Sequence, residues 1–487
     1  MLRWPGSTAV VAARLSTLLV AYPKTRAAGC CWSPLTDGSS GPWCFYKSGD
    51  SPSSCFVFSN STATAPFSDS EVAAFRANFE ANINVETVGA VVAAPDHDTP
   101  GGNYYYHWMR DGALSMKSFQ DTNPDDFDKV RPIMEKYTEW VVGRQALAPV
   151  HDDTDVRTEP KFEIPSGEVF DGAWCRPQND GPGLRAITLM TFAESLIAAG
   201  DKDYIAANLW TADGSLNGGA IAWDLQYVVE SWDSNTCDLW EEVRSTDFFW
   251  NRVTMKKAML MGSAFAEKMG DSKNAGIYAQ TAADIDAKLE SHWMGTFVAE
   301  EENRQKDGAV LVGFNNGFHE SDGKYAPTSV EVASTLNVYN TAFCAEYAVN
   351  TADTADEVPG VLIGRYPGDS YAGGNPWVLT TAALAQVLYR AASYTKVNGA
   401  PEADALAQFE AALNVDFPES VDGIAEVFAA AGDSVMLRLK EHVGDDDGHL
   451  DEQLDRSDGS QMSAKDLTWS YAEVLNAMQA REIYKAM

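Results

Sequence analysis

Apolar residues recur at intervals of three and four positions along most of the chain, which is the spacing of an amphipathic α-helix. The clearest helix start is at Ser68 and Glu71, a capping-box pair that precedes Phe75 and Phe79 on one face. With a few shorter segments, the pattern predicts about a dozen helices. The main ones span residues 125–145, 184–199, 245–269, 274–293, 330–349, 377–394, 402–413, 424–431 and 465–483.

Strand-like alternation is rare, and the best candidate for a β-strand is the apolar run at residues 309–314. Asn375 and Pro376 suit the N-cap and the first turn of a helix. Residues 56–67 are rich in Ser, Thr and Ala, which is typical of a linker. No charge run or low-complexity tract divides the chain beyond them. We therefore predict one all-α domain over residues 68–487, with functional loops between its helices.

The amino-acid composition limits the classes of ligand that the chain can bind. A net charge of −34 over 487 residues argues against nucleic acid, because its phosphates would be repelled. Neutral sugars are not repelled, and the 14 tryptophans and 18 tyrosines include flat faces that can stack on sugar rings. Most of these aromatic residues are still expected to pack in the core. No run of about 18 apolar residues is present, so we predict no transmembrane segment.

The N-terminal part of the chain differs from the rest. Residues 1–29 combine Arg3 and Arg14 with a short apolar stretch, and we interpret them as a weak secretory signal or an unstructured leader. Four of the seven cysteines then lie between residues 30 and 55, and a glycosylation sequon begins at Asn60. These features indicate a secreted or endomembrane-lumen protein with disulfides. The other three cysteines are scattered and are predicted to be ordinary buried thiols: Cys175, Cys237 and Cys344.

The cysteine-rich segment carries a resemblance of its own. Its adjacent Cys30-Cys31 pair and its Pro42-Trp43-Cys44 run resemble the second half of a trefoil (P-type) domain, a small module that three disulfides hold together. The first three half-cystines of that family have no counterpart upstream. The resemblance therefore implies a partial trefoil module over residues 30–55.

The most informative stretch for chemistry is residues 237–243, where Asp238, Trp240, Glu241 and Glu242 stand close together. A carboxyl group that keeps its proton near neutral pH needs apolar cover and nearby negative charge. Leu239 and Trp240 can supply the cover, and Asp238 and Glu242 the charge. The alternative interpretation is two acidic residues in the first turn of a helix, which the helix dipole favours.

Four loop segments gather arginine, acidic residues and tryptophan. They span residues 103–112, 174–185, 364–377 and 451–471. A guanidinium offers a rigid fork of donors and a carboxylate accepts from two hydroxyls, which suits vicinal diols. Structural ion pairs with packed aromatic rings are the alternative. The seven histidines show no metal-binding spacing and the acidic run at 445–447 does not fit a calcium loop, so we predict neither a metal nor a cofactor.

Taken in order on an all-helical chain, these motifs resemble glycoside hydrolase family 15, the glucoamylases, from about residue 70 to 487. The resemblance implies an (α/α)6 toroid of six inner and six outer helices with the pocket at one end. It assigns the general acid to Glu241 and the general base to Glu452. It also implies that the following residues bind substrate: Tyr104, Trp108, Arg110, Asp111, Trp174, Glu242, Arg365, Trp377 and Trp469.

The resemblance implies hydrolysis with inversion. Glu241 protonates the leaving oxygen while Glu452 activates water on the opposite face, with the carboxyl groups about 6.5–9.5 Å apart. We expect a monomer that releases β-glucose from the non-reducing ends of α-1,4 glucans or maltooligosaccharides, and α-1,6 links more slowly. Granular starch is expected to be a poor substrate, because no starch-binding module follows Met487. The alternatives are a trehalase- or dextran-glucosidase-type enzyme and a non-catalytic glycan-binding protein.

Overall fold

The computed structural model describes residues 55–59, 64–99, 102–152, 154–211, 219–321, 323–444 and 447–487. All of them belong to one structural unit, Ser54–Met487. The expected leader at 1–29, the trefoil-like segment apart from Cys55, and the sequon at Asn60 lie outside the described residues. The structure leaves these three predictions untested.

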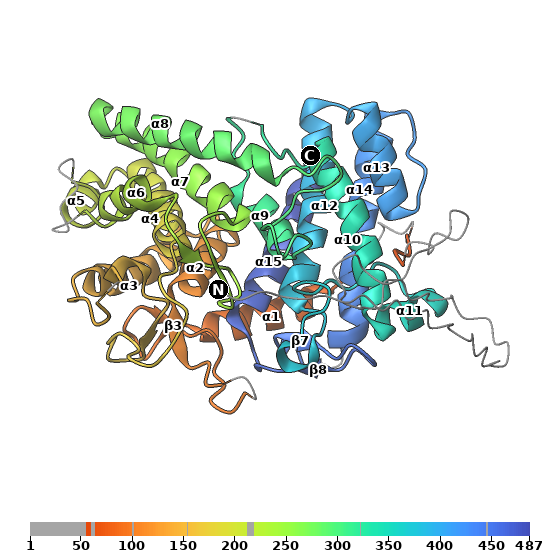
Figure 1. The fold of residues 1–487 in the computed structure, drawn as a ribbon, viewed down its shortest axis with the longest axis horizontal. Helices are drawn as coiled ribbons and strands as arrows, with labels where there is room; N and C mark the ends of the chain where they lie inside the picture. Colours follow the sequence, from red (N-terminus) through yellow and green to blue (C-terminus); the bar gives the residue numbers. More distant parts are fainter. Residues whose placement is uncertain are drawn as a thin grey trace, which may run out of the picture. The chain divides into compact units, whose positions relative to one another are not determined.

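Six helices, all labelled in Figure 1, form a closed ring, because each contacts the next and the last contacts the first. This closure is the inner layer that an (α/α)6 toroid requires. In order around the ring the helices are α2 (Met109–Asp121), α4 (Asp180–Ala198), α7 (Phe249–Lys268), α9 (Ala309–Gly317), α12 (Val378–Asn398) and α15 (Thr468–Lys485).

The remaining long helices alternate with the ring helices along the chain. Five of them pack directly on a ring helix, and α10 (Val330–Glu346) packs against α13 (Ala403–Leu413) and α11 (Ala348–Ala355). The five are α1 (Asp69–Ala81) on α15, α3 (Phe127–Gln145) and α6 (Ala220–Ser231) on α4, α8 (Ser272–Leu289) on α7, and α14 (Val421–Val443) on α12. The prediction of an all-α fold is therefore confirmed.

The short elements complete the described chain. They are the one-turn helix α5 (Lys202–Tyr204), a π-helical turn at Ile205–Leu209, and 3-10 turns at Val156–Thr158, Glu290–His292 and Tyr371–Gly373. No helix among the described residues is both long enough and apolar enough to cross a membrane.

The helix starts test the sequence patterns directly. The capping box is confirmed, because Ser68 Oγ accepts from the Glu71 backbone N–H at 3.3 Å and the Glu71 carboxylate accepts from the Ser68 N–H at 2.6 Å. The expected cap at Asn375 and Pro376 is wrong. Pro376 instead pairs with Gly364 in a β-bridge, and α12 begins at Val378.

The predicted strand at residues 309–314 is also wrong, because this run forms the first part of α9. Asp307 caps it by accepting a hydrogen bond from the Ala309 N–H at 2.8 Å. Every residue from Ala309 to Phe314 is buried, since α9 is covered on all sides within the ring. A helix without a solvent face has no polar positions to interrupt its apolar run, so its periodicity is lost.

Four antiparallel two-stranded sheets lie in the loops. Their strands pair as β1 (Ile83–Val85) with β2 (Ala90–Val91), β3 (Tyr106–Trp108) with β4 (Lys161–Glu163), β5 (Thr236–Cys237) with β6 (Arg244–Ser245), and β7 (Gln453–Leu454) with β8 (Gln461–Met462). Three of these pairs precede a ring helix and carry site residues. His107 is buried in β3, where burial lowers its pKa to about 3.

Two disulfides correct the interpretation of the scattered cysteines. Cys55 bonds to Cys344 on α10, and Cys175 bonds to Cys237 at the end of β5. None of Cys175, Cys237 and Cys344 is therefore a free thiol. Wide sequence separation concealed the pairs, because disulfide connectivity depends on distances in the folded chain and not on spacing along it.

Candidate active site

A cavity of about 400 Å³ lies where the N-terminal ends of α2, α12 and α15 meet the hairpin loops. The structure thus brings together, on one surface, residues that are up to several hundred positions apart in the sequence. Within the described part of the chain, no group of three or more His, Cys, Asp or Glu side chains could hold a metal ion. All the residues assigned to catalysis or sugar binding line the cavity: Tyr104, Trp108, Arg110, Asp111, Trp174, Glu241, Glu242, Arg365, Trp377, Glu452 and Trp469.

Glu241 sits on the turn between β5 and β6. Its backbone is left-handed, with a φ of 66°, a conformation that costs a non-glycine residue free energy unless its surroundings enforce it. The Asp238 carboxylate enforces it by accepting from the N–H groups of Glu242 at 2.7 Å and Val243 at 2.9 Å. Asp238 thus holds the turn in shape, in addition to any charge it contributes.

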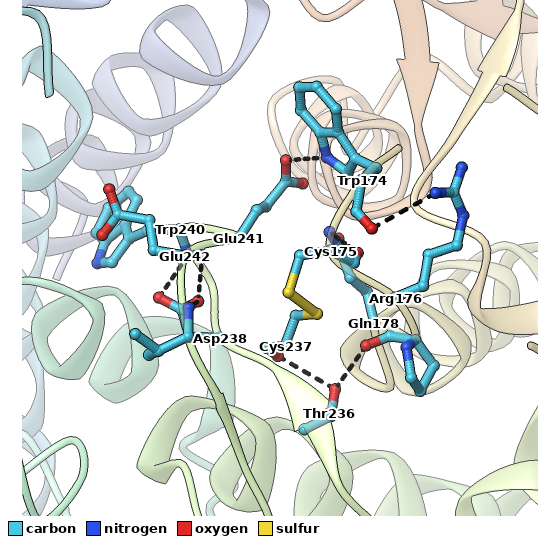
Figure 2. The surroundings of a disulfide bond; sticks show 12 residues. Trp174, Cys175, Arg176, Gln178, Thr236, Cys237, Asp238, Trp240, Glu241 and Glu242 are labelled. Atoms are coloured by element: carbon cyan, nitrogen blue, oxygen red, sulfur yellow. Dashed lines mark hydrogen bonds between the residues drawn. A yellow bond between two sulfur atoms is a disulfide. The ribbon is translucent and has the colours of Figure 1, made fainter. Parts of the chain in front are cut away.

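The Glu241 side chain points away from its sequence neighbours. Its carboxylate accepts from the indole N–H of Trp108 at 2.9 Å, the indole N–H of Trp174 at 2.5 Å and Arg110 Nη2 at 2.9 Å. Figure 2 shows Glu241 directed toward Trp174, while Trp240 and Glu242 lie on the other side of the turn. The aromatic cover next to this carboxylate therefore comes from other loops.

The Cys175–Cys237 disulfide connects two of the segments that form this corner. Trp174 precedes one half-cystine, and Asp238, which caps the turn, follows the other (Figure 2). The bond therefore keeps the indole of Trp174 and the turn that carries Glu241 in the same neighbourhood.

Arg110 and Asp111 occupy the first turn of α2. Arg110 is buried and donates through Nη1 to Asp180 and Gln178, both at 3.1 Å, so its Nη2 is fixed toward Glu241. Asp111 is also buried, and burial raises the pKa of its carboxyl group to about 6, although Arg110 opposes this shift. The pair presents a fixed donor and an acceptor to the cavity.

Glu242 and Arg365 form a second polar corner. Arg365 Nη2 donates to Glu242 at 2.8 Å, and its Nε and Nη2 both donate to Asp369. Glu242 also accepts from Arg304 at 3.1 Å and from the Tyr366 hydroxyl at 2.5 Å. Arg365 is buried and hydrogen-bonded to a carboxylate on each side, so its N–H donors point in fixed directions.

Glu452 lies before β7, and its surroundings differ from those of Glu241. Its carboxylate accepts from the hydroxyls of Tyr104 at 2.8 Å and Ser463 at 2.5 Å, and from the Gln453 amide at 2.8 Å. Burial raises the pKa of Glu452, and these three hydrogen bonds oppose the rise. Tyr104 itself is linked to the Tyr371 hydroxyl at 2.6 Å.

The tryptophans give the cavity its wall. Trp108, Trp377 and Trp469 are buried, whereas Trp174 is 38% exposed, as expected at a mouth. Trp469 is fixed by a hydrogen bond from its indole to Glu473 at 2.9 Å. Trp377 packs against the Trp240 ring at a centroid distance of 5.3 Å.

Comparisons with known proteins decide the family. The sequence profile of Glycosyl hydrolases family 15 matches residues 80–479. This chain belongs to glycoside hydrolase family 15. A glucoamylase of Blastobotrys adeninivorans is 32% identical over 86% of this chain and 71% of the relative. A probable glucoamylase of Schizosaccharomyces pombe is 31% identical over 82% of this chain and 86% of the relative.

Solved structures of family 15 agree with the fold. The family 15 glucoamylase from Hypocrea jecorina aligns with a TM-score of 0.75 at 30% identity, covering 85% of this chain and 72% of that one. The glucoamylase from Saccharomycopsis fibuligera aligns with a TM-score of 0.75 at 25% identity, covering 88% and 98%.

The family 15 cavity also contains residues that sequence reasoning did not single out. Lys161, on β4 opposite Trp108, places its ammonium 3.4 Å from the Trp174 ring centroid and 4.5 Å from that of Trp108. Burial lowers the pKa of Lys161 to about 8. A single lysine in a short strand has no distinguishing pattern, so only the fold could reveal it. Tyr371, next to Arg365 and Tyr104, was missed for the same reason.

Proposed function

We propose that this family 15 hydrolase is a glucoamylase that removes glucose from the non-reducing ends of α-1,4 glucans. The glucoamylases at about 30% identity support this assignment. The observation that carries it is that Glu241 and Glu452, which are distant in the sequence and differently surrounded, line one cavity. Inverting hydrolysis needs one carboxyl group as acid and another as base, and these two can supply both roles.

The proposed reaction is a single displacement. Glu241 gives its proton to the glycosidic oxygen as the bond to the anomeric carbon breaks. Glu452 takes a proton from a water whose oxygen attacks that carbon from the opposite face, so the configuration inverts. The hydrogen bonds from Tyr104, Ser463 and Gln453 favour the ionised form of Glu452 that this step needs.

Arg110, Asp111 and Arg365 are proposed to hold the hydroxyl groups of the terminal glucose. A sugar bound at this corner displaces water from the groups around it, which strengthens the hydrogen bonds between the protein and the sugar.

The size of the cavity favours attack at chain ends. About 400 Å³ is near the lower end of the range for small-molecule sites, and the interior of a long polysaccharide would not fit in it. The two disulfides support a secreted or lumenal location, since such bonds persist in oxidising compartments. We also propose that the enzyme acts as a monomer.

Proton NMR of fresh product tests the proposed function. With maltotriose as substrate, the signal of β-glucose should appear first and that of α-glucose only as the product mutarotates. Product that is initially α-glucose would contradict the single displacement. Parallel assays with trehalose and dextran separate the alternative specificities, and either one hydrolysed faster than maltotriose would overturn the assignment as a glucoamylase.

A further inference from the structure

A second cavity, of about 850 Å³, lies toward the opposite ends of the ring helices. The first cavity is lined by Arg110 and Asp111 at the start of α2, whereas the second is lined by Gln120 and Asp121 at its end. At about 1.5 Å per residue, the two places are roughly 15 Å apart along the helix axis. No residue lines both cavities, so the second cavity is separate from the proposed active site.

Two cations from ring helices on either side of α9 line the second cavity. Lys257 comes from α7 and Arg390 from α12, and neither has a carboxylate at ion-pair distance within the described part of the chain. Arg390 Nη1 donates to the backbone carbonyl of Asn315 at 2.7 Å, a neutral acceptor. Asp121 also lines the cavity, but its carboxylate is engaged by Lys117 at 2.5 Å.

Burial disfavours the charged form of both groups. Burial and the charges of Lys117 and Arg390 together lower the pKa of Lys257 to about 7, and Asp121 opposes them. Burial likewise lowers the pKa of Arg390 to about 10, against Glu320 and Asp121. Two cations that repel each other beside a cavity form a site that a bound anion would stabilise.

The wall also contains neutral amide side chains that are half-buried. Asn476 and Gln479, both on α15, line the cavity. An amide offers both a donor and an acceptor, so these side chains can hydrogen-bond to the hydroxyl groups of a ligand.

We propose that the second cavity binds a small phosphorylated polyol, with its phosphate between Lys257 and Arg390 and its hydroxyl groups toward the amide wall. Inorganic phosphate alone would leave most of the cavity to water, because the cavity is much larger than this anion. Phe127 and Val130 give the remaining wall an apolar part for the carbon chain.

Isothermal titration calorimetry tests this site, with inorganic phosphate and glycerol phosphate as separate probes at low salt. Both should bind one per chain, and glycerol phosphate should bind more tightly. Lys257→Met and Arg390→Met should each weaken binding by about ten-fold or more. The matched control Lys273→Met, at an exposed lysine on α8, should bind as the wild type does. Equal affinity for the two probes would contradict a role for the hydroxyl groups.

Two further variants keep the test independent of folding defects. Lys257→Arg and Arg390→Lys retain the charge, and each should keep affinity within a few-fold of the wild type. Lys161→Met removes a cation from the proposed active site, and its binding should be unchanged. The proposal is overturned if neither probe binds saturably, if Lys257→Met binds normally, or if Lys161→Met is the variant that loses binding.

Discussion

The two carboxyl groups of the cavity are held in opposite ways. Glu241 stands on a strained turn with its side chain 13% exposed, and two indoles and the Arg110 guanidinium donate to it. Glu452 is 2% exposed and receives only neutral donors, from two hydroxyls and an amide. One group has a charged donor that is also proposed to bind the sugar, and the other has only neutral donors within the protein.

This difference suggests that substrate changes the surroundings of one carboxyl group more than those of the other. The partner of Glu241 is proposed to bind sugar as well, so its surroundings change when substrate enters. The donors to Glu452 lie on its own hairpin or on the neighbouring Tyr104, so they stay in place. A variable environment suits an acid that must acquire and release a proton, and a constant one suits a base that must orient water.

The largest expected effect comes from removing each carboxylate in turn. Glu241→Gln and Glu452→Gln keep the shape of the side chain but not its proton chemistry, so each should lower kcat on maltotriose by about 10³- to 10⁴-fold. Steady-state kinetics measures this effect. Glu426→Gln, at an exposed position of α14, is the control and should leave kcat unchanged.

A substrate with a good leaving group separates the two roles. α-Glucosyl fluoride needs little help from an acid, so Glu241→Gln should recover much of its activity on it. Glu452→Gln should stay inactive, because the attacking water still needs a base. Recovery by Glu452→Gln instead would exchange the two assignments, and recovery by neither would refute the division into acid and base.

The next largest effect concerns the disulfide beside Glu241. The Cys175–Cys237 bond closes a loop with a sequence separation of 62, and its loss through Cys175→Ala/Cys237→Ala should lower the free energy of unfolding by up to about 4 kcal/mol. Because Trp174 and the Glu241 turn are then less well fixed, kcat should also fall, by about ten-fold. Chemical denaturation and steady-state kinetics measure the two changes.

The matched control is Cys55→Ala/Cys344→Ala, which removes the other disulfide and touches neither carboxyl group. It should lower stability and leave kcat nearly unchanged. An equal fall of kcat in both double variants would mean that the loss is a general consequence of destabilisation. In that case the disulfide beside Glu241 would have no special part in positioning it.

The sequence predicted most helices of both layers, but not the ring helix α9. Helices such as α1 keep a polar face toward solvent, so the apolar spacing and the cap at Ser68 are visible in the chain. The ring helix α9 has no such face and was mistaken for a strand. The start of α12 was misplaced by two residues, because a β-bridge between Pro376 and Gly364 holds the residues before it.

The site residues that belong to recognisable sequence motifs could be predicted. Every residue assigned from the four loop segments and the Glu241 stretch lies on the cavity. What could not be predicted depends on contacts between segments. Asp238 was expected to supply charge and also caps a turn, the cover next to Glu241 comes from Trp108 and Trp174, and Lys161 enters through strand pairing with Trp108.

A third carboxyl group, Glu473 on α15, extends the comparison. It is buried, and few hydrogen bonds offset the cost of burying its charged form. It accepts one hydrogen bond from Trp469, and its second oxygen has no partner among the described residues. Burial raises the pKa of Glu473 to about 7, from an ordinary value of 4.5. The group therefore stays protonated in the folded chain at pH values where it ionises in the unfolded chain.

The sign of the resulting pH effect follows from this order of pKa values. Between pH 4.5 and 7 the unfolded chain gains stability by ionising Glu473, so the free energy of unfolding should fall by up to about 3 kcal/mol across this range. The Glu473→Gln variant has no ionisable group at this position, so it lacks this contribution. The difference in unfolding free energy between wild type and variant should therefore change by that amount across this pH range. Asp111 and Asp307 also titrate, but they do so in both proteins, so their contributions cancel. Denaturation curves at several pH values measure it, with Glu426→Gln as the exposed control. If the wild-type and Glu473→Gln curves run parallel, the partners of this carboxyl group compensate fully for its burial.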